Sequence, residues 1–155
     1  MIHNLVLRRL RYALNLKETD MQAIFALAGH KIKPFSISLL LKKEDEQGYL
    51  ECSDAVLEKF LDGLIIQRRG VREGQAPATA QRMNNNLILK KIRIAFELKE
   101  DDLLDIMDKA GFALSRPELS ALFRKYDSRN YKACGDQLLR NFLHGICEHY
   151  RPKKG

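Results

Sequence analysis

The sequence predicts an all-α protein that consists of two tandem four-helix repeats packed as a pseudo-two-fold pair. Residues 4–69 align without a gap with residues 86–151, and 24 of these 66 pairs are identical, which indicates an internal duplication. Each copy contains four segments with the apolar spacing of one helix face. Because a repeat of about 66 residues gains little net stability from a core of its own, we expect the two copies to pack against each other.

The duplication also defines the organisation of the chain. We expect a first helical repeat in residues 1–69, a linker in residues 70–85, and a second helical repeat with a basic tail in residues 86–155. The linker carries Gly, Pro, Ala and Gln without an apolar period, which is typical of a connecting segment.

The first two helices of each copy have recognisable ends. Asn4 and Asn86 precede the first apolar run and are expected to be N-caps. The second helix begins near acidic residues, which suit the positive end of the helix dipole. It ends at Gly29 or Gly111, because glycine adopts the left-handed backbone conformation without steric cost.

The third and fourth helices follow in both copies. The third is short and begins at Pro34 in the first copy and at a capping box, Ser115 to Glu118, in the second. The fourth has the most regular apolar pattern but contains Gly63 or Gly145, and glycine in a helix costs about 0.5–1 kcal/mol relative to alanine. We therefore predict that another backbone or a bulky side chain approaches both glycines, and the contact between the copies is one place for it.

Composition places the chain among soluble globular proteins. Of its 155 residues, 45% are hydrophobic and 30% are charged, a balance that supports a real core. No apolar run approaches the roughly 18–20 residues that a membrane span needs, so we expect a cytoplasmic protein without membrane contact. Three cysteines do not form a disulfide framework, and Cys52 and Cys134 are repeat equivalents, so we expect buried, reduced thiols.

The ordered double occurrence of several short features resembles one bacterial family. These features are the Asn-Leu-x-Leu starts at Asn4 and Asn86, the Leu-Lys-Glu triplets that follow, the Ala-Gly pairs, and the fourth helices near Cys52 and Cys134. Nearly the full chain is similar to the YehS family, a duplicated domain of unknown function. The resemblance implies a small bacterial helical protein and carries no mechanism with it.

Basic side chains are the main candidates for a binding function. The formal net charge of +7 permits contact with nucleic acid or with an acidic protein. Basic residues on the first helices and after the third helices are suited to neutralising phosphates. The candidates for nucleic-acid binding are Arg8, Arg9, Lys42, Lys43, Lys90, Lys91, Arg124 and Lys125.

Two arginines beside the predicted core have a different expected role. Arg11 and Arg93 flank the apolar face of the first helices, and we expect them to form ion pairs with nearby acids. The acids are Glu18 or Asp20 for the first, and Glu100 or Asp102 for the second.

Two classes of function remain open. One is a nucleic-acid-binding or regulatory protein, because the second and third helices resemble a helix-turn-helix, although the turn is about two residues longer than in phage-repressor-like motifs. The other is a helical adaptor that binds another protein and no nucleic acid. The two differ in whether the basic residues of both copies form one continuous face.

Catalytic and metal-binding interpretations have little support in the sequence. The loop 44–48 resembles an EF-hand turn, but Arg129 lies inside the matching segment of the second copy. His144, Cys147 and His149 do not share one helix face, and a structural zinc site needs four ligands. Glycine-rich phosphate loops and Ser-His-Asp spacings do not occur. We therefore expect a binding protein without a metal or cofactor, and not an enzyme.

Overall fold

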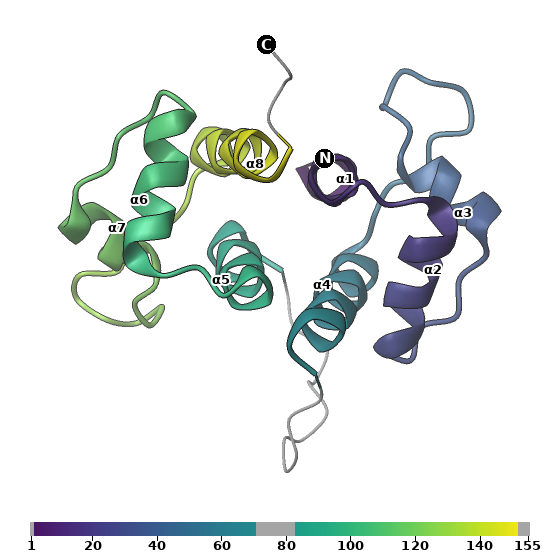
Figure 1. Cartoon of the computed structure of the whole chain (residues 1–155), viewed down its shortest axis with the longest axis horizontal. Helices are drawn as coiled ribbons and strands as arrows, with labels where there is room; N and C mark the ends of the chain where they lie inside the picture. Colours follow the sequence, from purple (N-terminus) through teal and green to yellow (C-terminus); the bar gives the residue numbers. More distant parts are fainter. Residues whose placement is uncertain (1, 71–82, 152–155) are drawn as a thin grey trace.

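The computed structural model describes residues 2–70 and 83–151, which form eight α-helices and no strand (Figure 1). The first repeat contains four of them and the second repeat the other four. In chain order the helices are α1 (Ile2–Leu14), α2 (Glu18–Leu27), α3 (Pro34–Leu40), α4 (Asp54–Arg69), α5 (Asn85–Phe96), α6 (Glu100–Lys109), α7 (Arg116–Leu122) and α8 (Asp136–Tyr150).

Four helices form the centre of the molecule, and they come from both repeats. α1 packs along α8 and α4 packs along α5, so each repeat supplies its first helix to the fourth helix of the other. α2 with α3, and α6 with α7, cover the outer sides (Figure 1). Helices that correspond in the two repeats lie on opposite sides of the centre in Figure 1, as a pseudo-two-fold axis requires. The predicted all-α pair of repeats is confirmed.

One apolar core extends through both repeats. It includes Phe25 and Phe60, whose rings lie 5.2 Å apart, and Phe142, the repeat equivalent of Phe60. Burying each side chain of this size contributes about 1.5–3 kcal/mol to folding. The second repeat joins this core before its first helix, because Met83 is buried and Asn84 caps α5. Residues 71–82 of the predicted linker and 152–155 of the predicted tail lie outside the described residues.

The predicted N-caps are wrong, because Asn4 and Asn86 lie inside α1 and α5. The Asn4 side chain is 1% exposed, and its Nδ2 donates to the carbonyl oxygens of Leu40 (2.9 Å) and Leu50 (2.8 Å). Its Oδ1 accepts from the backbone N–H of Cys52 at 2.9 Å and from the Tyr49 hydroxyl at 3.0 Å. The amide therefore ties the loop before α4 onto α1.

The second repeat uses the same asparagine clamp. Asn86 Nδ2 donates to the carbonyl oxygens of Leu122 and Lys132, both at 2.9 Å, and its Oδ1 accepts from the N–H of Cys134 at 2.9 Å. An asparagine suits this position because its amide both donates and accepts, which neither a carboxylate nor a hydrophobic residue does.

We expect Asn4→Asp to destabilise the protein strongly. A carboxylate cannot donate to the two carbonyl oxygens, and each buried polar group left without a partner costs about 1–3 kcal/mol. Chemical denaturation should show this loss of unfolding free energy. Asn86→Asp is the matched variant, and it should cost less because Asn86 is only partly buried. Equal stability of Asn4→Asp and the wild type would contradict the clamp.

The close approach predicted at the helix glycines is confirmed, but it does not lie at the contact between the copies, which was one place expected for it. A Cβ on Gly63 would overlap the carbonyl oxygen of Ile24, and one on Gly145 would overlap the carbonyl oxygen of Ile106 and lie 2.7 Å from its Cγ2. Both contacts are inside a repeat, where α4 crosses α2 and α8 crosses α6. The glycines therefore allow the outer helices to touch the central ones.

Replacing either glycine with alanine should lower stability despite the better helix propensity of alanine. Forcing a methyl group into a packed contact costs about 1–3 kcal/mol or more, which exceeds the gain of about 1 kcal/mol in propensity. Thermal or chemical denaturation of Gly63→Ala and Gly145→Ala measures the net effect.

Gly135→Ser is the control, because a Cβ at Gly135 meets nothing within 4 Å and the repeat equivalent, Ser53, caps α4. This variant should keep or slightly raise the stability. An alanine variant at Gly63 that is more stable than the wild type would contradict the packing role.

Candidate functional site

The eight basic residues predicted to bind nucleic acid do not lie on one face. Arg8 and Arg9 belong to α1, and Arg8 Nη1 donates to the carbonyl oxygen of Lys42 at 3.2 Å, which joins one group. Lys43 follows in the same loop. Lys90 and Lys91 belong to α5, which lies on the opposite side of the centre from α1 (Figure 1). Arg124 and Lys125 follow α7. Like Lys90 and Lys91, they therefore belong to the second repeat.

The contact between α4 and α5, here called the α4–α5 seam, is neutralised by ion pairs. Lys91 Nζ pairs with Asp62 Oδ1, and the two side chains are only 14% and 21% exposed. Arg69 Nε lies 3.3 Å from Glu97 Oε1. Because its ammonium group already has a carboxylate partner in a half-buried place, Lys91 is a poor candidate for phosphate contact.

The pseudo-equivalent contact is the α1–α8 seam. The two helices run parallel: the Cys147 thiol donates to the carbonyl oxygen of Arg9 at 3.4 Å, and Arg151 Nη1 donates to that of Tyr12 at 3.1 Å. The Arg151 guanidinium also lies over the Tyr12 ring, 4.6 Å from its centroid. The Arg151 side chain is thus held in place along this seam.

Charge distinguishes the two seams. Arg140 and His144 on α8 are the repeat equivalents of Glu58 and Asp62 on α4. Arg9 is the equivalent of Lys91, which pairs with Asp62. The α1–α8 seam therefore has a histidine where the other seam has the acid that pairs with Lys91. We call the resulting set the basic seam. Its members are Arg8, Arg9, Arg140, His144 and Arg151.

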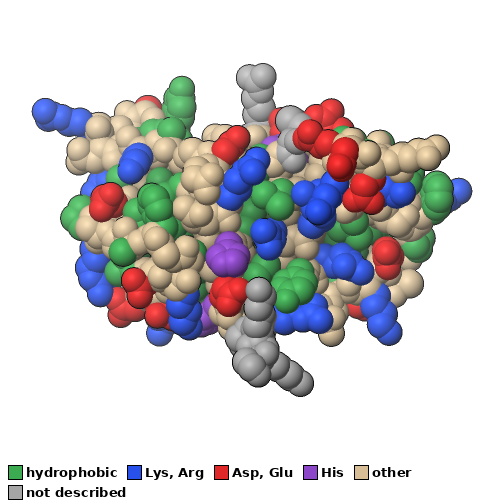
Figure 2. Space-filling view, turned by 90° about the horizontal axis from the view of Figure 1, so that it is seen from above, with side chains coloured by type: hydrophobic (Ala, Val, Ile, Leu, Met, Phe, Trp, Pro, Cys, Tyr) green, Lys and Arg blue, Asp and Glu red, His purple; other side chains and the backbone are tan. Residues whose placement is uncertain are grey.

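Figure 2 looks onto this side of the molecule and shows Lys and Arg side chains gathered along the middle of the face, over α1 and α8. Two acids lie among them. Glu44 is within electrostatic range of Arg8 and Arg140, and Glu148 Oε1 lies 4.0 Å from His144 Nε2. The basic seam is therefore cationic overall, although its charge is partly offset.

The loop after α7 forms a second basic region that sequence analysis identified only in part. Arg124 and Lys125 are exposed, as predicted, and Tyr126 beside them is 82% exposed. Arg140, His144, Arg151 and Tyr126 were missed as candidates. Comparing the copies position by position would have identified three of them, because an acid in the first repeat stands opposite each of Arg140, His144 and Tyr126.

A hollow of about 270 Å³ lies next to this loop, and its lining combines two arginines with one acid and three uncharged residues: Arg93, Arg124, Glu100, Leu119, Ser120 and Phe123. Arg93 lies over the Phe123 ring at 4.6 Å and donates Nε–H to the carbonyl oxygen of Leu98 at 3.1 Å. Arg93 is therefore a structural residue, but not through the predicted ion pair.

Three of the four acids expected to pair with Arg11 or Arg93 have other partners. Asp20 and Asp102 accept hydrogen bonds from the backbone N–H groups of Lys17 and Lys99, both at 2.8 Å. Those bonds provide a partner for the backbone N–H of the N-cap residue of α2 and of α6. Glu100 lies 3.5 Å from Arg116.

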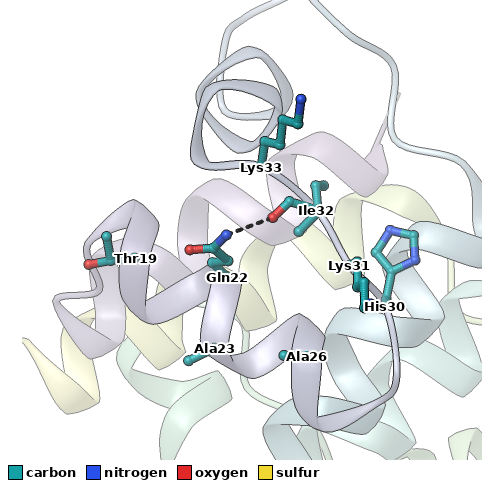
Figure 3. Close-up of a pocket in the computed structure, with 8 residues that line it drawn as sticks. All are labelled: Thr19, Gln22, Ala23, Ala26, His30, Lys31, Ile32 and Lys33. Carbon is teal, nitrogen blue, oxygen red and sulfur yellow. Dashed lines mark hydrogen bonds between the residues drawn. The ribbon is translucent and has the colours of Figure 1, made fainter.

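A larger groove, of about 550 Å³, lies at the turn between α2 and α3 of the first repeat (Figure 3). Small or uncharged side chains of α2 form one wall, and the turn residues His30–Lys33 form the other. Gln22 Nε2 donates to the carbonyl oxygen of Ile32 at 3.0 Å and joins the two walls. The α2 residues of the groove are Thr19, Gln22, Ala23 and Ala26.

The comparison with known proteins agrees with the duplicated architecture. The model of a family described as "Protein of unknown function (DUF1456)" matches residues 3–70 and again residues 85–151. The chain belongs to the DUF1456 family. The Uncharacterized protein YehS of Escherichia coli (strain K12) is 44% identical over 157 residues, with the whole of both chains covered. No solved structure gives a significant match.

The two DUF1456 segments correspond to the two structural repeats, and each contains one cysteine before its fourth helix. Burial, followed by the nearby Asp54 and Asp136 carboxylates, raises the pKa of Cys52 to about 12 and that of Cys134 to about 11. Burial also raises the pKa of Cys147. All three thiols are buried, as the sequence suggested.

Histidines have structural neighbours. His3 Nε2 donates to Asp54 Oδ1 at 2.6 Å. His149 packs edge-on against Tyr150. Among residues 2–70 and 83–151, no three His, Cys, Asp or Glu side chains are grouped to hold a metal ion. Within the same residues, no helix has the length and apolar character of a membrane span.

Native Cys52 and Cys134 should react slowly with a thiol reagent such as Ellman's reagent at pH 8. With pKa values near 12 and 11, fewer than about one thiol in a thousand is a thiolate at that pH. The denatured protein is the control and should react completely. Rapid labelling of the native protein at either residue, located by mass spectrometry, would contradict the pKa direction.

The same shifts predict the direction of one pH effect on stability. Above the ordinary thiol pKa of 9.0, the unfolded thiols lose protons that the folded thiols keep. The unfolded state then binds fewer protons, so the free energy of unfolding should fall as the pH rises above about 9.

Proposed function

We propose that this DUF1456 protein binds the phosphate backbone of nucleic acid through the basic seam. The observation that carries the proposal is the difference in charge between the two pseudo-equivalent seams. Where Asp62 neutralises Lys91 in one seam, the other seam has His144 at the position equivalent to Asp62 and Arg9 at the position equivalent to Lys91. An acid at that position would have been compatible with the fold, because the α4–α5 seam has one.

The way the arginines are held supports phosphate contact. Arg8 and Arg151 donate one N–H to a backbone carbonyl oxygen, which restrains each side chain and leaves further donors on the guanidinium. Guanidinium groups match phosphate oxygens in geometry and keep their charge at every physiological pH. Restrained side chains also lose less conformational entropy on binding.

Binding of this kind is electrostatic and independent of base sequence. Each phosphate that a cation neutralises releases counterions, so affinity falls with salt. The proposal is for a binding protein and not an enzyme, and the protonated state of its buried thiols supports this choice.

The second candidate function is a helical adaptor, which the groove of Figure 3 favours. Ala23 and Ala26 would allow a partner helix to approach α2 closely, and Lys31 and Lys33 on the opposite wall would attract acidic side chains. The basic seam ranks first because cations from both repeats converge on it.

Copying the acids of the α4–α5 seam onto α8 tests the proposal directly. The double variant Arg140→Glu, His144→Asp should bind a random-sequence duplex of about 20 base pairs at least ~10-fold more weakly at ~50 mM salt. Its plot of log K against log salt should flatten by about 1–2 units, since each lost phosphate contact removes about 0.9. Fluorescence anisotropy at ~50 and ~200 mM salt measures both quantities.

A control variant removes the same charge elsewhere. Lys31→Glu, Lys33→Gln also changes the net charge by three units, but on the groove of the first repeat, and should change affinity by about twofold or less, because separated charges are screened. Equal weakening by both variants would show a response to net charge alone and would contradict the seam. Failure of the wild type to bind at the lower salt would also reject the proposal.

A further inference from the structure

The loop between α7 and α8 differs in chemistry from its counterpart in the first repeat. Residues 124–132, here called the tyrosine loop, contain four basic residues and one acid, Asp127. The equivalent residues 42–50 contain two basic residues and three acids. The basic residues of the tyrosine loop are Arg124, Lys125, Arg129 and Lys132, and all four are exposed.

An exposed aromatic ring lies among these cations. Tyr126 is 82% exposed, the largest value among the exposed large hydrophobic side chains of the described residues, and occupies the position of Glu44 in the first repeat. Its ring contacts that of Tyr131 edge-on, with centroids 5.7 Å apart. This contact steadies Tyr126 and still leaves most of its surface open to solvent.

Hydrogen bonds fix the loop that carries the ring. The N–H of Ser128 donates to the carbonyl oxygen of Lys125 at 2.9 Å, and that of Tyr131 donates to Ser128 at 3.2 Å. The N–H of Lys132 donates to Ala121 at 3.0 Å, and its carbonyl oxygen accepts from Asn86 at 2.9 Å. The asparagine clamp thus holds the end of the tyrosine loop.

An open aromatic ring between exposed cations suits one class of ligand. Bases of a single strand can stack on an aromatic face while the neighbouring phosphates pair with basic side chains. In a duplex the base faces are already stacked on one another, and only the phosphates and groove edges are available. The ring therefore adds nothing to duplex binding, but it adds a contact to a single strand.

We propose that the tyrosine loop binds single-stranded nucleic acid, with a base stacked on Tyr126 and the flanking phosphates on Arg124, Lys125 and Arg129. This site is separate from the basic seam and does not require it. The hollow beside Phe123 and Arg124 lies next to the loop and gives an extended strand further room.

Replacing the ring tests the site in the full-length protein. Tyr126→Ala should weaken binding of a fluorescent oligo(dT) of about 15 nucleotides by roughly 5- to 150-fold, the range for one base–aromatic stack. Tyr126→Phe keeps the ring and should bind nearly as well as the wild type. Neither variant should change the affinity for the random-sequence duplex. Because the chain contains no Trp, quenching of tyrosine emission by oligo(dT) gives a second measurement, and it should weaken in Tyr126→Ala.

Phe35→Ala is the matched control, since Phe35 is 73% exposed but lies on α3 of the first repeat. It should leave oligo(dT) binding unchanged. Wild-type affinity of Tyr126→Ala for oligo(dT), or an equal loss for oligo(dT) and duplex, would overturn the inference.

The test also separates this inference from the function proposed for the basic seam. If the seam variant keeps duplex affinity while Tyr126→Ala loses oligo(dT) affinity, the seam is rejected and the tyrosine loop stands. If the seam variant loses duplex affinity while Tyr126→Ala binds oligo(dT) normally, the reverse holds.

Discussion

The structure depends on an exchange of helices between the repeats. α1 makes its main contact with α8 and only a minor one with α4 of its own repeat, and α5 likewise packs mainly on α4. Neither repeat can therefore cover its first helix alone. The apolar faces of α1 and α5 are fully buried only when the two copies pack together, so the core is complete only in the whole chain.

A helix glycine and a buried asparagine in each repeat make this exchange possible. The glycines at 63 and 145 let α2 and α6 touch the central helices, which leaves the opposite faces of α4 and α8 free for the other repeat. The clamps at Asn4 and Asn86 hold the loop before the fourth helix against the first. The same clamp that organises the core also holds the loop on which Tyr126 is displayed.

Much of the fold could be predicted from the sequence because the duplication and the helical periodicity are local or repeated signals. The steric role of Gly63 could be inferred from its cost in a helix, and the left-handed positions of Gly29 and Gly111 from their place after Ala. The role of Asn4 could not, because an asparagine near a helix start has the same local pattern whether it caps the helix or reaches a distant loop. The candidate site was harder, since the pairing of Lys91 with Asp62 depends on which helices of different repeats meet.

The helix exchange has a consequence for how such a protein can change over time. If a single repeat assembled as a symmetric dimer, both seams would be encoded by the same residues, and an acid introduced beside one arginine would appear beside the other. Joining two copies in one chain removes that restriction. His144 and Asp62 can then differ, as can Tyr126 and Glu44, so covalent fusion allows a symmetric scaffold to acquire two unlike surfaces without disturbing the core they share.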